Sequence, residues 1–333
     1  MIDLQEVHLS AVIDAVRANQ RFLCISHVAP DGDAVGSLLG MGEILTMLGK
    51  EATLALADGV PDNLTFLPGT ERVVSADGVG DVYDCVIVLD VSSPDRMGNV
   101  YREDAHGKSP LVVIDHHVTN TYFGDVDWVE PRCAAVCQML VYLAQRLGVS
   151  LRGNLAEDLL TGLVTDTLCF RTSNTTADVL GAATVLMENG AQLSAITART
   201  LNNKPFRSLK LWGEVLPGAR LAERVLWVTV APEQLAAAQA TAGDLELSSV
   251  LSAVAEADIS ATFIQKTDER KAPVVECSFR AKPGFNVSDT AFALGGGGHP
   301  AAAGCTVPGT LEKAVPPIVA QLQQARAQQA TGQ

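Results

Sequence analysis

Asp and His residues stand beside or inside apolar runs at four places in the first half of the chain. These places are residues 27–33, the run that ends at Asp90, the triplet at residues 115–117, and Asp166. Apolar runs of this length, bounded by turn residues, are typical of buried strands in an α/β sheet. Ligands of such sheets gather at the carboxyl ends of the strands. We therefore expect the four places to meet at one edge of a sheet.

A cluster of so many acidic side chains requires a cation. Crowded carboxylates repel one another and resist ionisation unless a positive charge neutralises them. Carboxylates mixed with imidazoles, without cysteine, suit Mn²⁺, or alternatively Mg²⁺, better than a thiolate-bound zinc. The number of ligands is enough for two divalent cations that share a bridging carboxylate, an arrangement that serves phosphoryl transfer. The predicted metal ligands are His27, Asp31, Asp33, Asp90, His116 and Asp166.

Each candidate ligand also has a plain structural interpretation. An Asp that follows a strand, such as Asp31 or Asp33, most often caps the next helix. Adjacent histidines such as His116 and His117 are commonly a solvated pair at a strand end. Asp166 differs, because a buried charge inside an apolar stretch needs a partner. The recurrence of the pattern at four places favours the metal-binding interpretation.

In their order along the chain, these residues resemble the four motifs of the DHH phosphoesterase superfamily. The resemblance rests on the His-x-x-x-Asp-x-Asp pattern at residues 27–33, the isolated Asp90, the Asp-His-His triplet at 115–117, and Asp166. The glycine-rich residues 295–304 resemble the signature of the domain that accompanies one DHH subfamily. Together the motifs span nearly the whole chain, and the likeness is greatest to bacterial nanoRNases and pAp phosphatases.

The resemblance implies roles for the central residues. It makes Asp90 the bridging ligand, His116 a metal ligand and His117 the catalytic residue that faces the phosphate. Asp115 could orient a neighbouring imidazole by accepting its distal N–H. We therefore take His117 and Asp115 as the catalytic candidates.

The second half of the chain offers candidates for substrate binding. The glycine run could be only a flexible loop, but backbone N–H groups without side chains can approach a phosphate closely. Residues 301–303 could begin a helix whose N-terminus faces the anion. Arg171 is as well suited to pair with a carboxylate as with a phosphate, and for Lys282 a simple surface charge is an even alternative. The predicted substrate-binding residues are Arg171, Arg280, Lys282, Gly297, Gly298 and His299.

Strand and helix patterns alternate through the first 190 residues. The expected strands are residues 22–26, 52–56, 86–90 and 111–114, and helices are expected near residues 134–147, 155–165 and 176–189. This order predicts a doubly wound, mainly parallel α/β sheet.

The chain is long enough for a second domain, since 333 residues with 47% hydrophobic content can form two cores. A helix is expected at 208–221, and the pattern that follows predicts a smaller mixed α/β domain. We expect a metal-binding catalytic domain at 1–190, a helical connector at 191–221 and a substrate-binding domain at 222–333.

The net charge of −14 argues against a protein that binds long nucleic acid, because such binding depends on basic surface. A short anionic substrate is compatible, since metal ions and a few basic side chains offset its charge locally. Seven cysteines without paired spacing, and no leader or long apolar stretch, predict a cytoplasmic protein with no membrane partner. A homodimer is compatible with the sequence.

We therefore predict a metal-dependent phosphoesterase that cleaves very short RNA, dinucleotides especially, to nucleoside 5′-monophosphates and also dephosphorylates pAp to AMP. A soluble phosphodiesterase that acts on cyclic di-AMP or its linear product pApA is the main alternative. A catalytically inactive nucleotide sensor is a weaker one, because every expected ligand is present. The sequence leaves open the balance among these substrates, the cleavage direction, the physiological metal and the oligomeric state.

Overall fold

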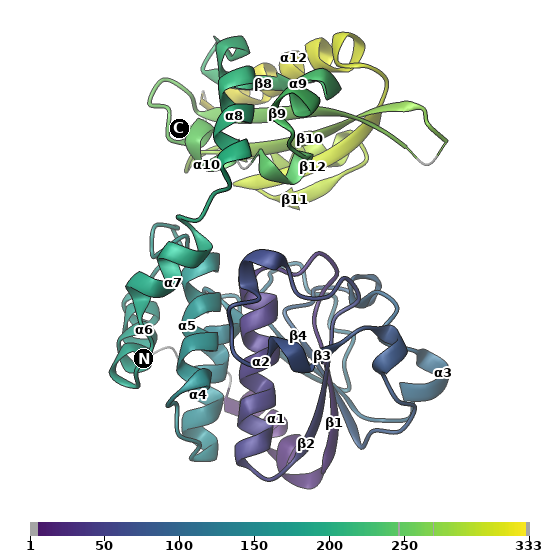
Figure 1. Ribbon diagram of the computed structural model, residues 1–333, viewed down its shortest axis with the longest axis vertical. Helices are drawn as coiled ribbons and strands as arrows, with labels where there is room; N and C mark the ends of the chain where they lie inside the picture. The colour runs from purple at the N-terminus through teal and green to yellow at the C-terminus, as the bar shows by residue number, and fades with distance from the viewer. Residues whose placement is uncertain (1–5, 246, 269, 331–333) are drawn as a thin grey trace. The chain divides into compact units, whose positions relative to one another are not determined.

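The computed structural model describes residues 6–245, 247–268 and 270–330. The chain divides into two compact units, Met1–Asn203 and Lys204–Gln333 (Figure 1). Each unit encloses its own buried apolar core.

A six-stranded sheet forms the centre of the first unit. Its strands lie in the order β3-β2-β1-β4-β5-β6, and every neighbouring pair is parallel. The strands are β1 (Arg21–Ile25), β2 (Glu51–Ala55), β3 (Val73–Val74), β4 (Cys85–Leu89), β5 (Leu111–Asp115) and β6 (Val126–Val129). The predicted doubly wound parallel sheet is thereby confirmed. The strand order reverses beside β1, and open α/β sheets bind their ligands at such a switch point.

The central strands are apolar throughout because both faces of the sheet are covered. In β4, Val86 and Val88 belong to the apolar cluster on one face. Ile87 and Leu89 belong to the larger cluster that the helices form on the other face. Successive side chains of a strand point to opposite faces, so a strand covered on both sides has no polar position. The continuous apolar runs in the sequence follow from this.

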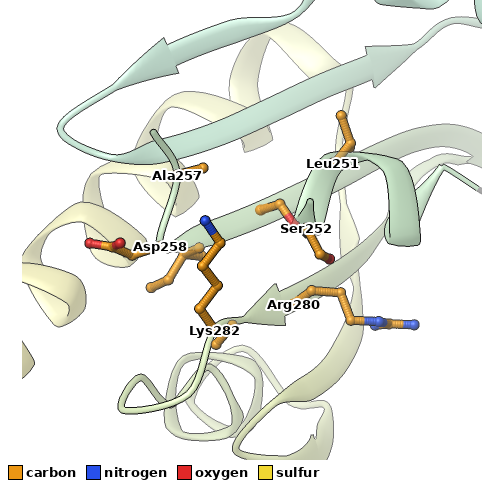
Figure 2. Close-up of a pocket in the computed structure, with 9 residues that line it drawn as sticks. Leu251, Ser252, Ala257, Asp258, Arg280 and Lys282 are labelled. Atoms are coloured by element: carbon orange, nitrogen blue, oxygen red, sulfur yellow. Dashed lines mark hydrogen bonds between the residues drawn. The ribbon is translucent and has the colours of Figure 1, made fainter. Parts of the chain in front are cut away.

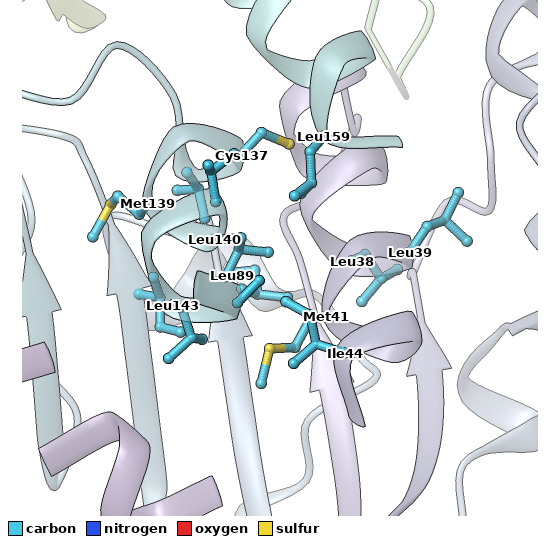
Figure 3. Close-up of a cluster of buried hydrophobic side chains, with 14 of the residues drawn as sticks. Leu38, Leu39, Met41, Ile44, Leu89, Cys137, Met139, Leu140, Leu143 and Leu159 are labelled. Carbon is cyan, nitrogen blue, oxygen red and sulfur yellow. The ribbon is translucent and has the colours of Figure 1, made fainter. Parts of the chain in front are cut away.

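Helices cover this sheet and set its core. They are α1 (Glu6–Ala18), α2 (Gly32–Met47), α3 (Glu103–His106), α4 (Val136–Leu147), α5 (Asn154–Asp166), α6 (Ala177–Glu188) and α7 (Leu193–Thr200), with short 3₁₀ turns at Asp62–Leu64, Thr70–Arg72, Ala76–Gly78 and Pro94–Met97. Helices α2, α4 and α5 pack against one another. In Figure 3, Ile44 of α2 and Leu143 of α4 gather around Leu89 at the end of β4. This packing fixes the helix ends beside the strand ends.

Helix α2 is buried on nearly all sides, and its glycines let α5 approach closely. A Cβ on Gly36 would lie 2.5 Å from the backbone oxygen of Asp158. A Cβ on Gly40 would lie 2.6 Å from the Leu159 side chain. Because the contact at Gly36 is with the backbone of Asp158, a side chain at Gly36 would force the two helices apart.

Asp158 lies in this tight interface, and both of its carboxylate oxygens are buried without a hydrogen-bond partner in the part of the chain that the structure describes. Burial raises the pKa of Asp158 well above its usual range, and the charges on Glu43 and Glu157 add to the effect. The folded protein therefore keeps a proton that the unfolded chain releases at roughly pH 3.9.

We expect the free energy of unfolding to fall as the pH rises above that value, by up to about 1.4 kcal/mol per pH unit, because the unfolded state then binds fewer protons than the folded one. Asp158→Asn cannot ionise and should remove this part of the fall. Urea denaturation of both proteins between about pH 5 and pH 8 measures the difference. A difference that does not change with pH would contradict a protonated Asp158.

The second unit contains another six-stranded sheet, in the order β11-β12-β10-β9-β8-β7. Its strands are β7 (Arg220–Ala222), β8 (Val225–Val230), β9 (Ile259–Thr267), β10 (Pro273–Ala281), β11 (Gly297–His299) and β12 (Ala302–Pro308). Its helices are α8 (Phe206–Val215), α9 (Pro232–Ala238), α10 (Ser248–Ser252), α11 (Ser288–Ala293) and α12 (Leu311–Ala330). Strands β8 and β9 are parallel and the other neighbours are antiparallel, which confirms the smaller mixed α/β domain.

Both faces of this sheet carry apolar clusters: α12 covers the first, and α8, α9 and α10 cover the second over β8 and β9. Val275, Cys277 and Phe279 alternate along β10 and pack with Leu322 of α12. Phe279 meets Phe263 of β9 edge-on, with 6.2 Å between the ring centroids. Ser278 and Arg280 alternate with these residues along β10 and therefore belong to the opposite face.

The residues expected to connect the domains are divided between the two units. Helix α7 packs on α5, whereas α8 packs on α9. The expectation of one helix at 208–221 is wrong at its C-terminal end, because α8 ends at Val215. A 3₁₀ turn that contains Pro217 and the edge strand β7 follow. Pro217 has no N–H to donate, which disfavours a continuous helix through this position.

The longest helix, α12, has 20 residues and carries Pro316 and Pro317 inside it. Its apolar positions, among them Ile318 and Leu322, pack on the second sheet. Among the described residues, no helix combines the length and the apolar composition of a membrane span.

Candidate metal centre

The structure brings the predicted ligands together at the carboxyl ends of the central strands. His27 lies just beyond β1, Asp90 directly follows β4, and His116 directly follows β5. Asp33 lies in the first turn of α2. Asp166 ends α5, a helix of 13 residues whose C-terminal end reaches the same edge. The helix expected near residues 155–165 is therefore confirmed, and the alternative that Asp166 ends a strand is wrong.

Asp90 lies at the centre of this cluster. Its Oδ2 is 3.5 Å from His27 Nε2, and its Oδ1 is 3.5 Å from His116 Nε2. Oδ1 is buried and has no hydrogen-bond partner among the residues described. A bound cation would satisfy this acceptor, so the donor set fits a metal. Asp90 also has a φ of 60°, a left-handed conformation that is costly outside glycine and is found where function requires it.

Three sets of ligand atoms, each within 4.8 Å of one another, could hold a cation: His27 with Asp31 and Asp90, Asp33 with His116 and Asp166, and Asp90 with His116 and His117. In the second set, His116 Nε2 lies 3.5 Å from Asp166 Oδ2 and 4.0 Å from Asp33 Oδ2. Asp90 therefore lies between two compact sets and has one oxygen toward each.

Helix N-termini hold two of the carboxylates. Asp33 is fully buried and accepts hydrogen bonds from Val136 N at 2.6 Å and Cys137 N at 2.9 Å, at the start of α4. Unpaired N–H groups at this end of a helix favour a negative charge. Asp31 caps α2 through hydrogen bonds from the backbone of Asp33 and Ala34, as its structural interpretation predicts. The same Asp31 oxygen lies 3.8 Å from His27 Nε2, so capping does not remove it from the cluster.

The pKa values show a cluster that balances its charge with protons. Burial, reinforced by neighbouring carboxylates, raises the pKa of Asp33 to about 7 and that of Asp166 well above its usual range. Burial opposes the charged imidazoles, but the carboxylates beside them, Asp90 and Asp31 at His27 and Asp90 at His116, raise the pKa of both histidines to about 10. Despite burial, the imidazoles hold the pKa of Asp90 far below its usual range. A divalent cation would replace these protons as the compensating charge.

Asp115 fixes the loop that carries the histidines. Its Oδ1 accepts a hydrogen bond from His116 N and lies 2.8 Å from His117 Nδ1, and Asn120 Nδ2 donates to its Oδ2 at 2.6 Å. Burial opposes a charge on His117, but the hydrogen bond to Asp115 and the charge on Asp90 raise its pKa. Asp115 therefore orients His117 and favours its protonated form. This is the contact with a neighbouring imidazole that was expected for Asp115.

The glycine-rich segment forms a hairpin of β11 and β12, which we call the glycine hairpin. The helix expected to begin at 301–303 is wrong, because Ala302 starts strand β12. The glycines cause this: a Cβ on Gly298 would lie 2.5 Å from Ala303 Cα, so the close pairing of these strands needs a residue without a side chain. Gly298 also has a φ of 136°, which favours glycine.

The glycine hairpin places Arg280 and His299 in one row. Ala302 pairs with His299 on β11 and with Arg280 on β10. Residues directly opposite one another share a face of the sheet, so Arg280 and His299 lie on the same face, two strand spacings or about 10 Å apart. The small side chain of Ala302 stands between them. This face carries two basic or polar side chains beside exposed glycine backbone at Gly297 and Gly298.

The two remaining candidates have other contacts. Lys282 Nζ donates to the backbone oxygens of Val254 and Ala255, beyond α10. In Figure 2 the side chains of Lys282 and Arg280 point in different directions. Arg171 is exposed, and its Nε donates to Leu168 O in the turn after α5. Arg280 and His299 are therefore the stronger candidates for substrate contact.

Comparisons with known proteins cover both units. Residues 21–165 match the family model described as the DHH family, N-terminal domain, and residues 233–328 match the DHHA1 domain. The bifunctional oligoribonuclease and PAP phosphatase NrnA of Thermus thermophilus is 36% identical over 284 residues, which cover 85% of this chain and 83% of that protein. The chain belongs to the DHH family.

Further relatives of this DHH protein agree with the assignment. The protein of the same name from Bacillus subtilis is 29% identical over 287 residues, 84% of this chain and 87% of that one. The crystal structure of an exopolyphosphatase-related protein from Bacteroides fragilis superposes with a TM-score of 0.89 at 22% identity and covers 97% of both chains. The second likeness shows the fold, and together they confirm the resemblance and the fold class inferred from the motifs.

Two residues that contact the candidate metal centre, Asn120 and Arg96, were not predicted from the sequence. Asn120 holds Asp115 and also donates to Val91 O at 3.0 Å. Its position three residues after His117 was the only local signal. Arg96 lies with its Nη2 3.1 Å from His27 Nδ1. Nothing local marks Arg96, because 69 residues separate it from His27 and only the sheet brings them together.

A glycine on α5 leaves room for the Asp33 carboxylate. A Cβ on Gly162 would lie 2.3 Å from Cys137 Sγ and 2.8 Å from Asp33 Oδ1. We expect Gly162→Ala to displace Asp33, to weaken Mn²⁺ binding roughly tenfold or more, and to cost about 1–3 kcal/mol of stability.

Titration calorimetry with Mn²⁺ and thermal denaturation measure the two effects of Gly162→Ala. Gly181→Ala on α6 is the matched control, since nothing lies within 4 Å of a Cβ there. The control should bind Mn²⁺ as the unmodified protein does. Unchanged Mn²⁺ binding by Gly162→Ala would show that the position of Asp33 is unimportant for the metal.

Proposed function

We propose that this DHH protein is a metal-dependent phosphoesterase that hydrolyses very short RNA, dinucleotides especially, to nucleoside 5′-monophosphates, and that it also dephosphorylates pAp to AMP. The arrangement of Asp90 carries the proposal: its two oxygens face two sets of ligands, and one of them is a buried acceptor without a partner among the described residues. The names of the Thermus and Bacillus relatives, which state oligoribonuclease and PAP phosphatase activity, support the choice of substrate.

Two divalent cations would occupy the centre, and Mn²⁺ suits the mixed ligands best, with Mg²⁺ as the alternative. His27, Asp31 and Asp90 would hold one ion, and Asp33, His116 and Asp166 the other, with Asp90 shared between them. When bound, the two ions would activate water and stabilise charge on the phosphate. The protein contributes the rigid positions of these ligands, which the strand ends and the start of α4 fix.

His117 and Asp115 would complete the catalytic group. Asp115 holds Nδ1 of His117, so the imidazole presents its Nε2 side in a fixed orientation. With its raised pKa, His117 can carry a proton at Nε2 and donate a hydrogen bond to a phosphate oxygen. Such a donor favours the transition state because the charge on the phosphate grows there.

The second unit would bind the remote part of the substrate. Arg280 and His299 share one face, and the N–H groups of Gly297 and Gly298 lie beside His299 on the same hairpin. A guanidinium with adjacent glycine backbone can bind phosphate or the polar edge of a nucleotide. Arg171 and Lys282 remain lesser candidates for such contacts. The predictions of a cytoplasmic location and of a homodimer stay predictions.

A panel of substrates tests the proposed function. In Mn²⁺, dinucleotides should be cleaved roughly tenfold to a hundredfold faster than RNA of a dozen or more nucleotides, because an exterior with a net charge of −14 repels a long polyanion. The measurement is kcat/KM for pAp, pApA, cyclic di-AMP and RNAs of increasing length, each with and without chelator.

The same panel separates the alternatives. Equal rates on short and long RNA would favour a processive exonuclease. Preference for cyclic di-AMP would favour the cyclic-dinucleotide phosphodiesterase. Binding of nucleotides without turnover of any substrate in Mn²⁺ would leave only a nucleotide sensor.

A further inference from the structure

Two cysteines face each other beneath the glycine hairpin. Cys277 on β10 is the direct register partner of Cys305 on β12. Their side chains point to the core face, where they are 1% and 8% exposed, and both are free thiols. The Cys277 thiol donates a hydrogen bond to Val275 O at 3.6 Å. Neither residue takes part in the metal centre or in the proposed substrate contacts.

The spacing of these cysteines suits a covalent bond. The backbone hydrogen bonds Ala281 N to Ala301 O and Gly309 N to Pro273 O mark hydrogen-bonded pairs at the two ends of the β10–β12 ladder. Such pairs alternate every second residue, and Cys277 lies an even number of residues from both Pro273 and Ala281, so it forms a pair of this kind with Cys305. The Cα atoms of such a pair lie about 5.5 Å apart, within the range in which disulfides form.

The structure describes all seven cysteines, and no other two of them are register partners on neighbouring strands. Cys24 and Cys85 lie on neighbouring strands, but Cys24 pairs with Ile87 and Cys85 with Phe22. Cys169 is partly exposed and lies in the turn after α5. The register of β10 and β12 therefore brings Cys277 and Cys305 together as direct cross-strand partners.

Cys305 also supports the start of the glycine hairpin. A Cβ on Gly296 would lie 2.5 Å from Cys305 Cβ and 2.1 Å from Gly304 O, so the glycine backbone rests directly on Cys305. The next residue, Gly297, pairs with Gly304. Rotation of the Cys305 side chain toward Cys277 changes the surface on which these glycines lie.

We propose that Cys277 and Cys305 are a thiol–disulfide modification site, which oxidised glutathione converts to an intrachain disulfide and which thereby restricts the glycine hairpin. The Cys305 thiolate attacks glutathione disulfide, breaks its S–S bond and releases one glutathione thiolate. The Cys277 sulfur then attacks Cys305, releases the second glutathione and loses its proton to solvent. Two protein thiols are oxidised, and one glutathione disulfide is reduced to two thiols.

The same contact selects the attacking sulfur. The neighbouring Cys277 thiol lowers the pKa of the Cys305 thiol, whereas the pKa of Cys277 is raised far above its usual range. Cys305 is also the more exposed of the two. An oxidant therefore meets the sulfur with the greater thiolate character first.

Thiol titration of the full-length protein tests the bond. After incubation with oxidised glutathione, the number of thiols that react with Ellman's reagent in denaturant should fall by two from seven, and dithiothreitol should restore them. Cys277→Ser and Cys305→Ser should each lose no pair of thiols, and Cys277→Val replaces Cys277→Ser if the serine does not fold. Cys169→Ser should behave as the unmodified protein. No loss of thiols, or a bond between other cysteines in the peptide map, would overturn the proposal.

Hydrogen exchange tests the restriction of the hairpin. Amide exchange in residues 295–304 should slow severalfold on oxidation and recover with dithiothreitol, and it should not respond to oxidant in Cys277→Val. Unchanged exchange despite a mapped bond would overturn the restriction. A changed KM for a dinucleotide in the oxidised protein is the further consequence, and this consequence alone rests on the proposed function. A protein that forms the bond but cleaves no dinucleotide when reduced would contradict the proposed function and would still support the disulfide proposal.

Discussion

Asp90→Ala is expected to lower the kcat/KM for a dinucleotide in Mn²⁺ by roughly 10³-fold. Asp90 is the residue whose two oxygens face both sets of candidate ligands, at 3.5 Å from His27 and 3.5 Å from His116. In the proposed two-ion centre its loss would remove the shared ligand from both ions at once, so the measured Mn²⁺ binding should fall together with turnover. Chelation of the unmodified protein should give the same loss, and added Mn²⁺ should reverse it.

Asp95→Ala is the matched control for this experiment. Asp95 lies in the same loop, five residues after Asp90, and is exposed. Its replacement should change neither Mn²⁺ binding nor turnover. Asp90→Asn keeps the size of the side chain and should lose activity as the alanine variant does, which separates charge from packing. Near-normal turnover in either Asp90 variant, with its fold verified by circular dichroism, would remove the two-ion mechanism.

Arg280→Ala and His299→Ala are each expected to reduce dinucleotide cleavage by roughly 10²-fold while hydrolysis of a small activated phosphodiester stays near normal. These residues lie together on one face of the second sheet, far along the chain from every metal ligand. If these residues hold the remote part of the substrate, their binding energy positions the scissile phosphate. A substrate that lacks this part cannot make these contacts, so it should not be affected by their loss. Both substrates are measured on the same preparations, together with Mn²⁺ binding.

Arg270→Ala is the control for Arg280, since it removes an exposed arginine from the turn between β9 and β10. It should leave both reactions unchanged. A parallel loss on both substrates in His299→Ala would place His299 in the chemical step itself. If neither substrate is affected, the glycine hairpin has only a structural role, and another surface must select the substrate.

The central strands that carry the metal centre could be predicted from the sequence, whereas the edge strands β6 and β11 could not. Strands β1, β4 and β5 each contain an apolar run of four or five residues, because both of their faces are buried there. Strand β6 (Val126–Val129) was missed, since Asp127 interrupts its short apolar pattern. Strand β11 consists of two glycines and His299, which have no intrinsic preference for a strand and pair only because β12 lies beside them.

The candidate ligands could be named from the sequence because their chemistry is local. A carboxylate at the end of an apolar run is costly without a partner, whatever the fold, and the spacing of His27, Asp31 and Asp33 is itself a pattern. For Asp166 the sequence left two interpretations, the end of a strand and the end of the helix near residues 155–165, and the structure shows the second. Its run, Leu163 and Val164, is too short to distinguish a strand from the end of a helix.

The sequence by itself thus determined which residues could bind a metal and that two α/β domains would form, since composition, periodicity and residue chemistry are properties of short segments. Only the tertiary structure decided how Asp90 divides its oxygens between two imidazoles, that the start of α4 holds Asp33, and that Cys277 meets Cys305. Each of these contacts joins residues that lie 26 to 103 positions apart in the sequence. Such contacts depend on strand order, register and helix packing, which the cooperative burial of the whole core selects and no local pattern encodes.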